Sequence, residues 1–502
     1  MKKLVTILLA IALIFAMSVP AFAADTANLT INGLEGRTYV GYKLLDLTTS
    51  HKANVNCGGT HNPETCYNYA YTVANDDYRT ILQNEVFENG TTTAAAATDI
   101  TDDQIIAYLA DQSSGDYAEM RVVADRIYAA IKAAGLGADK TEFDGSASID
   151  QGYWMFVDTT SLNGQNAANS FVMVDTKGET NLDITPKTAL PTITKEVYDI
   201  NDTTGANGWG DSADHDITDE VEFRLTATLA ENYAYYETYK LVFHDDLADG
   251  LTLDTASFVV TAKNGDDVLD ITDKFAITYP QDCDFEVTFD DVTAIDGVTK
   301  DTVFVVTYKA TLNENAVVGT AGNANEVTLE FSNDPYSDST GKTSAAVKVY
   351  TYQLVINKVD EEGNPLTGAG FTLYKMVGGV KTKIGEEVKG DGMTTFTWTG
   401  LDDGDYVLEE STVPAGYNKM ADKEFTITAE HTKDGITTLT SGIDETDKDA
   451  GTLTEDIVNR TGPILPETGA MGTVALISVG SILVIVAAVF MITRKKMSVY
   501  ED

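Results

Sequence analysis

Short runs rich in valine, threonine, tyrosine and phenylalanine recur from about residue 187 to residue 461, and glycine, asparagine and aspartate separate them. Such runs between turn-forming residues are typical of antiparallel β-strands, whose side chains alternate between two faces. The pattern predicts a mainly β chain that contains tandem Ig-like β-sandwich domains. We expect the two sandwiches to span residues 187–350 and 351–464.

The region before these sandwiches has a different pattern. Between about Asp102 and Gly135, apolar residues recur at the spacing of one helix face. A strand-like run, Gly152–Val157, follows this segment. The sequence therefore predicts an α+β N-terminal domain at residues 24–186.

The first residues predict export. Lys2 and Lys3 precede an apolar run from Leu4 to Val19, and Ala21-Phe22-Ala23 has the small-residue pattern of a cleavage site. A basic region, an apolar core and small residues in this order predict a signal peptide at residues 1–23.

The chain ends with a short motif, an uncharged stretch and a basic tail. These are Leu465-Pro466-Glu467-Thr468-Gly469, residues 472–492, and Arg494, Lys495 and Lys496. A helix over the uncharged stretch is long enough for a hydrocarbon core of about 30 Å. Basic residues after it favour a cytoplasmic end, so the sequence predicts a transmembrane helix at 472–492.

The three features together resemble the cell-wall sorting signal of Gram-positive bacteria, whose motif is LPxTG. In proteins with that signal, a sortase cysteine attacks the bond that corresponds to Thr468–Gly469 here. The acyl group on Thr468 then passes to an amine. The resemblance implies a sorting signal at residues 465–502, with only transient anchoring in the membrane.

Charge and cysteine content exclude several other classes. The chain has 34 Lys and Arg residues against 78 Asp and Glu residues, a formal net charge of −44, which argues against nucleic acid as a partner. Cys57 and Cys66 flank a Gly/Pro loop and are a candidate disulfide in an exported chain, which leaves Cys283 alone. His51 and His61 fit no common zinc spacing with them, so we expect no metal and no cofactor.

Polar residues interrupt the apolar faces of the predicted strands. Lysine, acid and asparagine recur in this order in both sandwiches, as Lys195, Asp245 and Asn325 and as Lys358, Glu410 and Asn459. A buried unpaired charge costs several kcal/mol. Burial also favours the neutral forms of the amine and the acid.

This combination permits a crosslinking reaction. A neutral lysine amine can attack the asparagine side-chain carbonyl while the acid polarises that carbonyl and moves protons. Ammonia leaves, and a Lys–Asn isopeptide bond remains. A buried salt bridge beside an amide is the alternative, and Asn323 and Asp246 stay open as partners of Lys195.

One stretch of the third domain carries a family resemblance. Residues Tyr406–Tyr417 resemble the E-box, YxLxExxAPxGY, of Cna B-type pilin domains, with Glu410 at the E-box glutamate and Val413 in place of alanine. The whole chain resembles the sortase-assembled backbone pilins. The resemblance implies isopeptide bonds Lys195–Asn325 and Lys358–Asn459, with Asp245 and Glu410 as the catalytic acids.

Backbone pilins also carry a motif that ends in Pro-Lys, whose lysine joins the next subunit. The match here is Ile184-Thr185-Pro186-Lys187, with Thr185 where tyrosine is usual. Lys187 is therefore the candidate intersubunit nucleophile, and Lys177 is the nearest competitor.

The resemblance implies a fimbrial shaft subunit and no enzyme. Its expected partners are a sortase, other copies of the chain in a covalent polymer, accessory tip and base pilins, peptidoglycan and a host-surface ligand. The alternative is a monomeric wall-anchored adhesin that binds host matrix or glycan. We further expect the stretch between Asn325 and Lys358 to be the most extensible, and Asn201–Asp216 to be a solvated turn rather than a calcium site.

Overall fold

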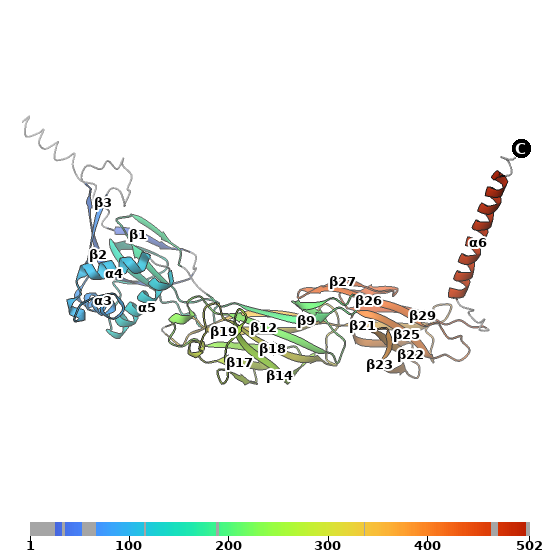
Figure 1. Ribbon diagram of the computed structural model, residues 1–502. Helices are drawn as coiled ribbons and strands as arrows, with labels where there is room; N and C mark the ends of the chain where they lie inside the picture. Colours follow the sequence, from blue (N-terminus) through green and yellow to red (C-terminus); the bar gives the residue numbers. More distant parts are fainter. Residues whose placement is uncertain are drawn as a thin grey trace, which may run out of the picture.

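The computed structural model describes residues 26–32, 36–52, 67–114, 117–186, 190–335, 337–462 and 470–497. The described strands form six sheets, two in each of three consecutive parts of the chain. The three parts follow one another in an elongated arrangement (Figure 1). The prediction of a mainly β chain with tandem sandwiches and a partly helical N-terminal region is confirmed.

The N-terminal part combines two sheets with a group of helices. Its strands are β1 (Thr26–Ile31), β2 (Tyr39–His51), β3 (Tyr67–Val73), β4 (Lys140–Phe143), β5 (Ser146–Asp150), β6 (Gly152–Asp158), β7 (Phe171–Asp175) and β8 (Asn181–Ile184). Its helices are α3 (Asp76–Asn89), α4 (Asp102–Ser114) and α5 (Tyr117–Ala133), with a 3-10 turn η1 (Ala97–Asp99). The sheets run in the orders β5-β1-β8 and β3-β2-β6-β7, and β4 pairs with β2.

The helical segment predicted from Asp102 is present as α4 and α5, but the sequence did not predict α3. Asn75 caps α3, because its side chain accepts a hydrogen bond from the Tyr78 amide at 2.8 Å. The buried Glu85 of α3 holds the three helices together. It accepts hydrogen bonds from Tyr108 of α4 at 2.7 Å and from Arg126 of α5 at 2.6 Å.

The second part, the middle sandwich, packs two six-stranded sheets face to face. Its strands are β9 (Ile193–Ile200), β10 (Asn207–Gly210), β11 (Ser212–Asp214), β12 (Glu220–Thr228), β13 (Leu241–Leu247), β14 (Leu251–Asn264), β15 (Asp267–Val268), β16 (Ala276–Thr278), β17 (Phe285–Phe289), β18 (Val303–Leu312), β19 (Asn323–Ser332) and β20 (Thr340–Tyr350), with 3-10 turns η2 (Tyr233–Tyr235) and η3 (Val292–Ala294). The sheet orders are β10-β9-β12-β18-β14-β15 and β11-β20-β19-β13-β17-β16.

Strict alternation builds the core between these sheets. In β18 the residues Phe304, Val306, Tyr308, Ala310 and Leu312 are buried, and those between them are half-buried. Facing strands add further aromatic rings, so a lysine or carboxylate on an inner face lies in a strongly apolar environment.

The third part, the third sandwich, is smaller. Its strands are β21 (Tyr352–Val359), β22 (Gly370–Val377), β23 (Val380–Lys389), β24 (Thr395–Leu401), β25 (Gly404–Thr412), β26 (Lys423–Thr432), β27 (Gly435–Thr440), β28 (Glu445–Asp447) and β29 (Thr452–Val458). The sheet orders are β24-β21-β29-β28 and β23-β22-β25-β26-β27. The first and last strands, β21 and β29, lie side by side and parallel, with Lys358 opposite Ile457.

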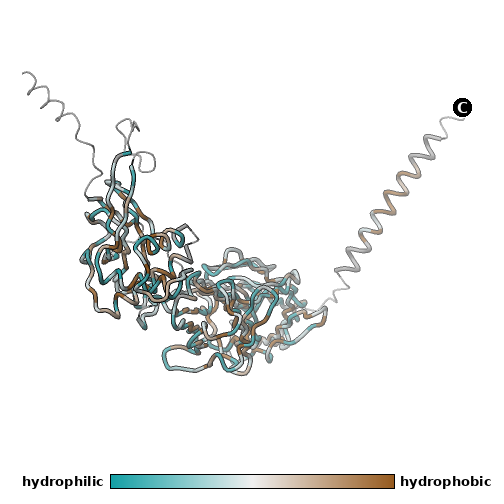
Figure 2. Tube along the Cα trace, turned by 60° about the vertical axis from the view of Figure 1, so that its left-hand side comes forward, coloured by the Kyte–Doolittle hydropathy of each residue, from teal (hydrophilic) through white to brown (hydrophobic). Residues whose placement is uncertain are grey.

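A single helix, α6 (Ala470–Met497), follows the third sandwich. Its described side chains, residues 477–491, are exposed, and the apolar ones appear brown in Figure 2. Among the side chains that the structure describes, no helix is both long and apolar enough to span a membrane.

Candidate functional site

The middle sandwich brings Lys195, Asp245 and Asn325 together in its core. Lys195 lies on β9 of one sheet, whereas Asp245 and Asn325 lie on the neighbouring strands β13 and β19 of the other. The Lys195 Nζ is 2.6 Å from Asp245 Oδ2 and also donates a hydrogen bond to Asn325 Oδ1. The side chains of Lys195 and Asp245 are both fully buried.

Aromatic rings surround the amine. The Lys195 Nζ lies 5.9 Å from the ring centre of Phe223 and 5.8 Å from that of Tyr308. Burial lowers the pKa of Lys195 to about 8, although the nearby Asp245 opposes this effect. Burial also raises the pKa of Asp245, against the opposing effect of Lys195. The environment therefore favours the neutral amine and the neutral acid, which are the forms that the predicted chemistry requires.

The two alternatives left open by the sequence have other surroundings. Asp246 points to the opposite face of β13 and is exposed. Asn323 is buried, but its amide binds backbone groups: Oδ1 accepts from the Val317 amide at 2.8 Å, and Nδ2 donates to the Val317 and Val349 carbonyls. Asn323 thus fixes the loop before β19, and Asn325 is the amide in contact with Lys195.

Sequence reasoning missed Tyr308, which belongs to the same cluster. Its hydroxyl donates to Asp245 Oδ1 at 2.8 Å and accepts a hydrogen bond from Asn325 Nδ2 at 2.7 Å. A tyrosine on a buried strand face carries no signal of its own, because tyrosine is an ordinary core residue.

The third sandwich also gathers its three predicted residues. Lys358 near the end of β21, Glu410 on β25 and Asn459 after β29 are all at most 1% exposed. Asn459 Nδ2 donates to Glu410 Oε1 at 2.7 Å, and the Met420 amide donates to Oε2 at 2.8 Å. Two sheets therefore contribute to the cluster, because β25 faces β21 and β29.

The amine of this second cluster is held close to its expected partner strand. Lys358 Nζ donates to the Ile457 carbonyl at 2.7 Å and to the Val359 carbonyl at 3.1 Å. Burial lowers its pKa to about 8, against the opposing effects of Glu410 and Asp360. The buried Asn459 Oδ1 has no hydrogen-bond partner among the described residues, so its carbonyl is open to a donor.

Several predicted residues lie outside the described residues. These are the signal peptide 1–23, Cys57 and Cys66, Lys187 and the motif Leu465–Gly469. Lys177 is described: it is exposed in the turn after β7, with φ of 44°. Cys283 is a free, partly buried thiol, and burial raises its pKa to about 11.

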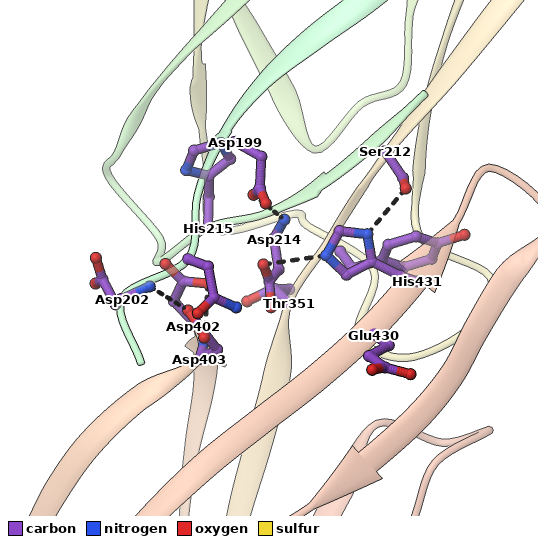
Figure 3. A network of polar contacts seen from close by, with 12 residues as sticks. Asp199, Asp202, Ser212, Asp214, His215, Thr351, Asp402, Asp403, Glu430 and His431 are labelled. Carbon is purple, nitrogen blue, oxygen red and sulfur yellow. Dashed lines mark hydrogen bonds and ion pairs between the residues drawn. The ribbon is translucent and has the colours of Figure 1, made fainter. Parts of the chain in front are cut away.

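The acidic segment Asn201–Asp216 is not the solvated turn that the sequence predicted. It contains β10 and β11 and packs against the third sandwich in the polar network of Figure 3. Asp214 is 1% exposed, accepts a hydrogen bond from the Tyr352 hydroxyl at 2.9 Å and lies 3.2 Å from His431 Nε2. The backbone amide of Asp202 donates to Asp403 Oδ1 at 2.7 Å. We call this contact region the sandwich joint.

Lys375 supplies the positive charge of the sandwich joint. Its Nζ lies 2.6 Å from Asp202 Oδ2, 2.6 Å from Asp216 Oδ2 and 3.6 Å from Asp402 Oδ2. Burial alone lowers the pKa of Lys375, but the three carboxylates raise it above its usual value. The joint is also tight: a Cβ added at Gly319, where φ is +84°, would lie 2.5 Å from the backbone of Ala450.

Carboxylates at the sandwich joint are close enough together to resemble a metal site, but the protein already supplies their partners. Asp199, Asp214 and His431 offer ligand atoms within 4.8 Å of one another. The Tyr352 hydroxyl and His431 Nε2 contact the two carboxylate oxygens of Asp214. Ser212 Oγ contacts the other ring nitrogen of His431, Nδ1. The joint is thus an internal ion and hydrogen-bond network.

The fold of the chain is shared with known proteins. The SpaA family, described as a prealbumin-like fold domain, matches residues 352–443. The solved T6 backbone pilin of Streptococcus pyogenes serotype M6 covers 88% of this chain and 99% of its own, with a TM-score of 0.52 and 18% sequence identity. The chain therefore has the fold of a Gram-positive backbone pilin.

One sequence relative aligns with about half of the chain. The trypsin-resistant surface T6 protein of Streptococcus pyogenes serotype M6 is 27% identical over 260 residues, which are 46% of this chain and 44% of the relative. The chain is thus homologous to the T6 protein, and it aligns with less than half of that relative's length. The full-length major pilin SpaD of Corynebacterium diphtheriae also matches, at 18% identity, with 87% of this chain and 98% of SpaD covered and a TM-score of 0.45. The T6 protein is a surface protein, and its solved structure is that of a backbone pilin.

Proposed function

We propose that the chain is the shaft subunit of a covalently polymerised, cell-wall-anchored pilus, stabilised by two autocatalytic Lys–Asn isopeptide bonds. One observation carries the proposal: each sandwich buries a lysine, a carboxylic acid and an asparagine at one point of its core. Three such groups are costly to bury in a core that only has to be stable. A reaction among them accounts for their presence.

The chemistry begins with the neutral amine. In the middle sandwich, Lys195 Nζ attacks Cγ of Asn325 while Asp245 takes up a proton from Nζ and returns a proton to the departing Nδ2 of Asn325. The amide nitrogen leaves as ammonia, and the Nζ–Cγ amide bond remains. In the third sandwich, Lys358, Asn459 and Glu410 have the same three roles.

The positions of the bonds suit a chain under tension. The first bond would bypass 130 residues between Lys195 and Asn325, and the second about 100 residues between Lys358 and Asn459. A load that enters near Lys187 and leaves at Thr468 would cross both sandwiches mainly through covalent bonds. The N-terminal part lies before Lys187 and would be outside that path.

Attachment would follow from the two ends of the chain. A signal peptide exports the chain, and the uncharged helix with its basic tail holds it in the membrane until a sortase cleaves between Thr468 and Gly469. The acyl group then passes to Lys187 of another copy, or to peptidoglycan at the base. Accessory tip and base pilins and a host-surface ligand complete the expected partners.

Intact mass spectrometry of the chain tests the isopeptide bonds. Each bond releases one ammonia, about 17 Da. With two bonds, the chain should be lighter than the mass calculated from its sequence by about 34 Da. Lys195→Ala and Lys358→Ala should each remove one of the two deficits. A mass equal to that of the plain sequence would refute the proposal.

Polymerisation is tested separately in a bacterium that expresses the matching sortase. Cell-wall extracts should show ladders that resist boiling, and Lys187→Ala should abolish them, whereas the exposed Lys177→Ala serves as the matched control. A single band from the unaltered chain would favour the alternative function, a monomeric wall-anchored adhesin. Ladders that are lost in Lys177→Ala would support the polymer but assign the intersubunit linkage to Lys177 instead of Lys187.

A further inference from the structure

The two buried clusters differ in how the acid reaches the leaving nitrogen. In the third sandwich, Asn459 Nδ2 donates directly to Glu410 Oε1 at 2.7 Å. In the middle sandwich the acid is aspartate, which is one methylene shorter, and Asn325 Nδ2 donates instead to the hydroxyl of Tyr308 at 2.7 Å. That hydroxyl in turn donates to Asp245 Oδ1 at 2.8 Å. The Tyr308 hydroxyl thus stands between the acid and the amide nitrogen in the middle sandwich, whereas in the third sandwich the acid contacts that nitrogen directly.

We propose that Tyr308 is a catalytic residue of the middle sandwich, whose hydroxyl passes a proton from Asp245 to the departing nitrogen of Asn325. The inference rests on the proposed isopeptide chemistry and adds a residue that neither the sequence motif nor the acid–base pair requires. The structure supplies the chain of contacts Lys195 Nζ, Asp245 Oδ2, Asp245 Oδ1, Tyr308 hydroxyl and Asn325 Nδ2.

The proton transfers balance along this chain. The neutral Lys195 amine attacks Cγ of Asn325, and its surplus proton goes to Asp245 Oδ2. The attack turns Nδ2 into a tetrahedral amine with a free lone pair, so the two hydrogen bonds of the Tyr308 hydroxyl reverse: Nδ2 becomes an acceptor, and Oδ1, which carries the proton of the neutral acid, becomes a donor. Asp245 then gives up the Oδ1 proton to the Tyr308 oxygen while the phenolic proton moves to Nδ2. The Cγ–Nδ2 bond breaks, and ammonia leaves with the proton that Lys195 lost. Asp245 and Tyr308 return to their starting forms.

The Tyr308 ring is held firmly in the position that this relay needs. It is 1% exposed and stacks on Phe223 at 5.3 Å and on Phe258 at 5.6 Å between ring centres. Phe285 meets it edge-on at 4.8 Å. Because these rings exclude bulk water, a protein hydroxyl has to take the part that water takes in an open site.

The electrostatics of the cluster agree with this role. Burial first, and then the neighbouring Asp245, raise the pKa of Tyr308 well above its ordinary value. The phenol therefore keeps its proton at neutral pH and has it available for the leaving nitrogen.

Tyr308→Phe tests the proposal, because it removes the hydroxyl and keeps the ring. The full-length chain is recovered in denaturant before it has folded, then diluted into buffer and sampled over time. After proteolysis, mass spectrometry counts the branched peptides that join Lys195 to Asn325 and Lys358 to Asn459. We expect Tyr308→Phe to slow the first bond by about 100-fold and to leave the second bond unchanged.

Two controls separate catalysis from folding. The second bond is an internal clock in the same molecule, and Tyr239→Phe removes another fully buried hydroxyl from the same core, one that does not contact the cluster. Tyr239→Phe should form both bonds at the unaltered rates. Near-ultraviolet circular dichroism should show that Tyr308→Phe reaches the folded state as fast as the unaltered chain.

The outcomes are distinct. An unchanged rate of the first bond in Tyr308→Phe would overturn the role of Tyr308 and leave the isopeptide proposal standing. Equal slowing of both bonds, or equal slowing by Tyr239→Phe, would mark a folding effect and would also overturn it. Absence of both branched peptides from the unaltered chain would refute the isopeptide proposal itself.

Discussion

Lys195 and Lys358 occupy comparable environments in two different cores. Each amine is buried, and burial lowers the pKa of each to about 8. At neutral pH a small but sufficient fraction of each lysine is then a neutral nucleophile, which an exposed lysine is not. The two amines differ in their hydrogen-bond partners: Lys195 contacts its acid, Asp245, directly, whereas Lys358 donates to backbone carbonyls.

The first prediction concerns the pH dependence of the Lys358–Asn459 bond. The attacking form is the unprotonated amine, whose fraction rises about tenfold per pH unit below the pKa and levels off above it. Because that pKa is about 8, the rate of bond formation should rise from about pH 6 to pH 8 and then become flat. Refolding the full chain at a series of pH values and counting the branched peptide measures this. A rate that falls as the pH rises over this interval would contradict the assignment of Lys358 as nucleophile.

Individual residues also show where sequence reasoning stops. The triad residues could be found because a lysine, an acid and an asparagine each break the apolar face of a strand. Tyr308 could not, since tyrosine belongs on such a face. Helix α3 was missed for a related reason: Glu85 lies on its buried side, and the arginine that makes this tolerable, Arg126, is 41 positions away.

At the scale of elements, the two expected bonds connect different kinds of elements: two opposite sheets in the middle sandwich, and two neighbouring strands in the third. Lys195 on β9 and Asn325 on β19 belong to opposite sheets, so their bond would tie the two layers of the middle sandwich together. Lys358 on β21 and Asn459 after β29 flank neighbouring parallel strands of one sheet. The second bond would therefore join the first strand of the third sandwich to its last.

The second prediction is that each bond stabilises only its own sandwich. A crosslink that closes a loop of about 100 residues removes about 4–5 kcal/mol of unfolded-state entropy. Lys195→Met should lower the urea midpoint of the middle sandwich, and Lys358→Met that of the third. The fluorescence of single-tryptophan chains separates them, since Trp209 lies in the middle sandwich and Trp398 in the third. A variant that shifts both midpoints equally would contradict independent stabilisation.

The misjudged segment Asn201–Asp216 illustrates the limit of local patterns at this scale. Its asparagines, glycines and aspartates are typical of a solvated turn. Its partners lie far along the chain: Tyr352 is 138 positions from Asp214, and Lys375 is 159 positions from Asp216. Only the docking of the two sandwiches brings them together, and no local pattern in the sequence encodes that docking.

At the scale of the whole molecule, the sandwich joint determines how the second and third parts are held. Polar groups of Asp202, Asp214 and Asp216 in the middle sandwich meet Tyr352, Lys375 and Asp403 in the third. Figure 3 shows Asp202, Asp214 and Asp403 in this network. Most of these groups are buried, so the network combines directional hydrogen bonds with little access for water.

The third prediction is that Lys375→Met loosens the sandwich joint. The substitution leaves the carboxylates of Asp202, Asp216 and Asp402 without their cation. Asp202 and Asp216 are partly exposed to water, so the loss should stay below the cost of about 3–5 kcal/mol for breaking a fully buried pair. Small-angle scattering should then require a wider range of shapes at neutral pH. The variant should recover towards acid pH, because protonation removes the repulsion among the carboxylates.

A matched control is Lys381→Met, which removes a partly exposed lysine paired with Asp422 at 3.1 Å on the same sandwich. A surface pair of this kind contributes little, so its scattering should not change. Equal changes in the two variants would show that charge at the joint does not hold the parts together.

The fourth prediction concerns extension under force. Asn325 lies opposite Val347, so a load carried into β19 by the first bond and out along β20 pulls the two strands of one hairpin apart from their open end. The first extension in single-molecule pulling should therefore come from the stretch between Asn325 and Lys358. A disulfide made by Thr328→Cys with Ser344→Cys, a directly facing pair, should shorten that step by about half, because it bypasses the tip of the hairpin. Unravelling of residues 196–324 first would contradict the expected load path.

The tip of that hairpin has a further consequence. Asn333 is fully buried, and its side-chain Nδ2 donates to the backbone carbonyls of Leu162 and Ala167 at 2.9 Å. Its backbone carbonyl accepts a hydrogen bond from the backbone amide of Asn169. The N-terminal part thus rests on the segment that tension would open. In the proposed pilus, tension that opens the hairpin would break these contacts and detach the N-terminal part from the middle sandwich. The covalent bonds would keep the fibre whole. The surfaces that the two parts cover at rest would then be exposed to solvent.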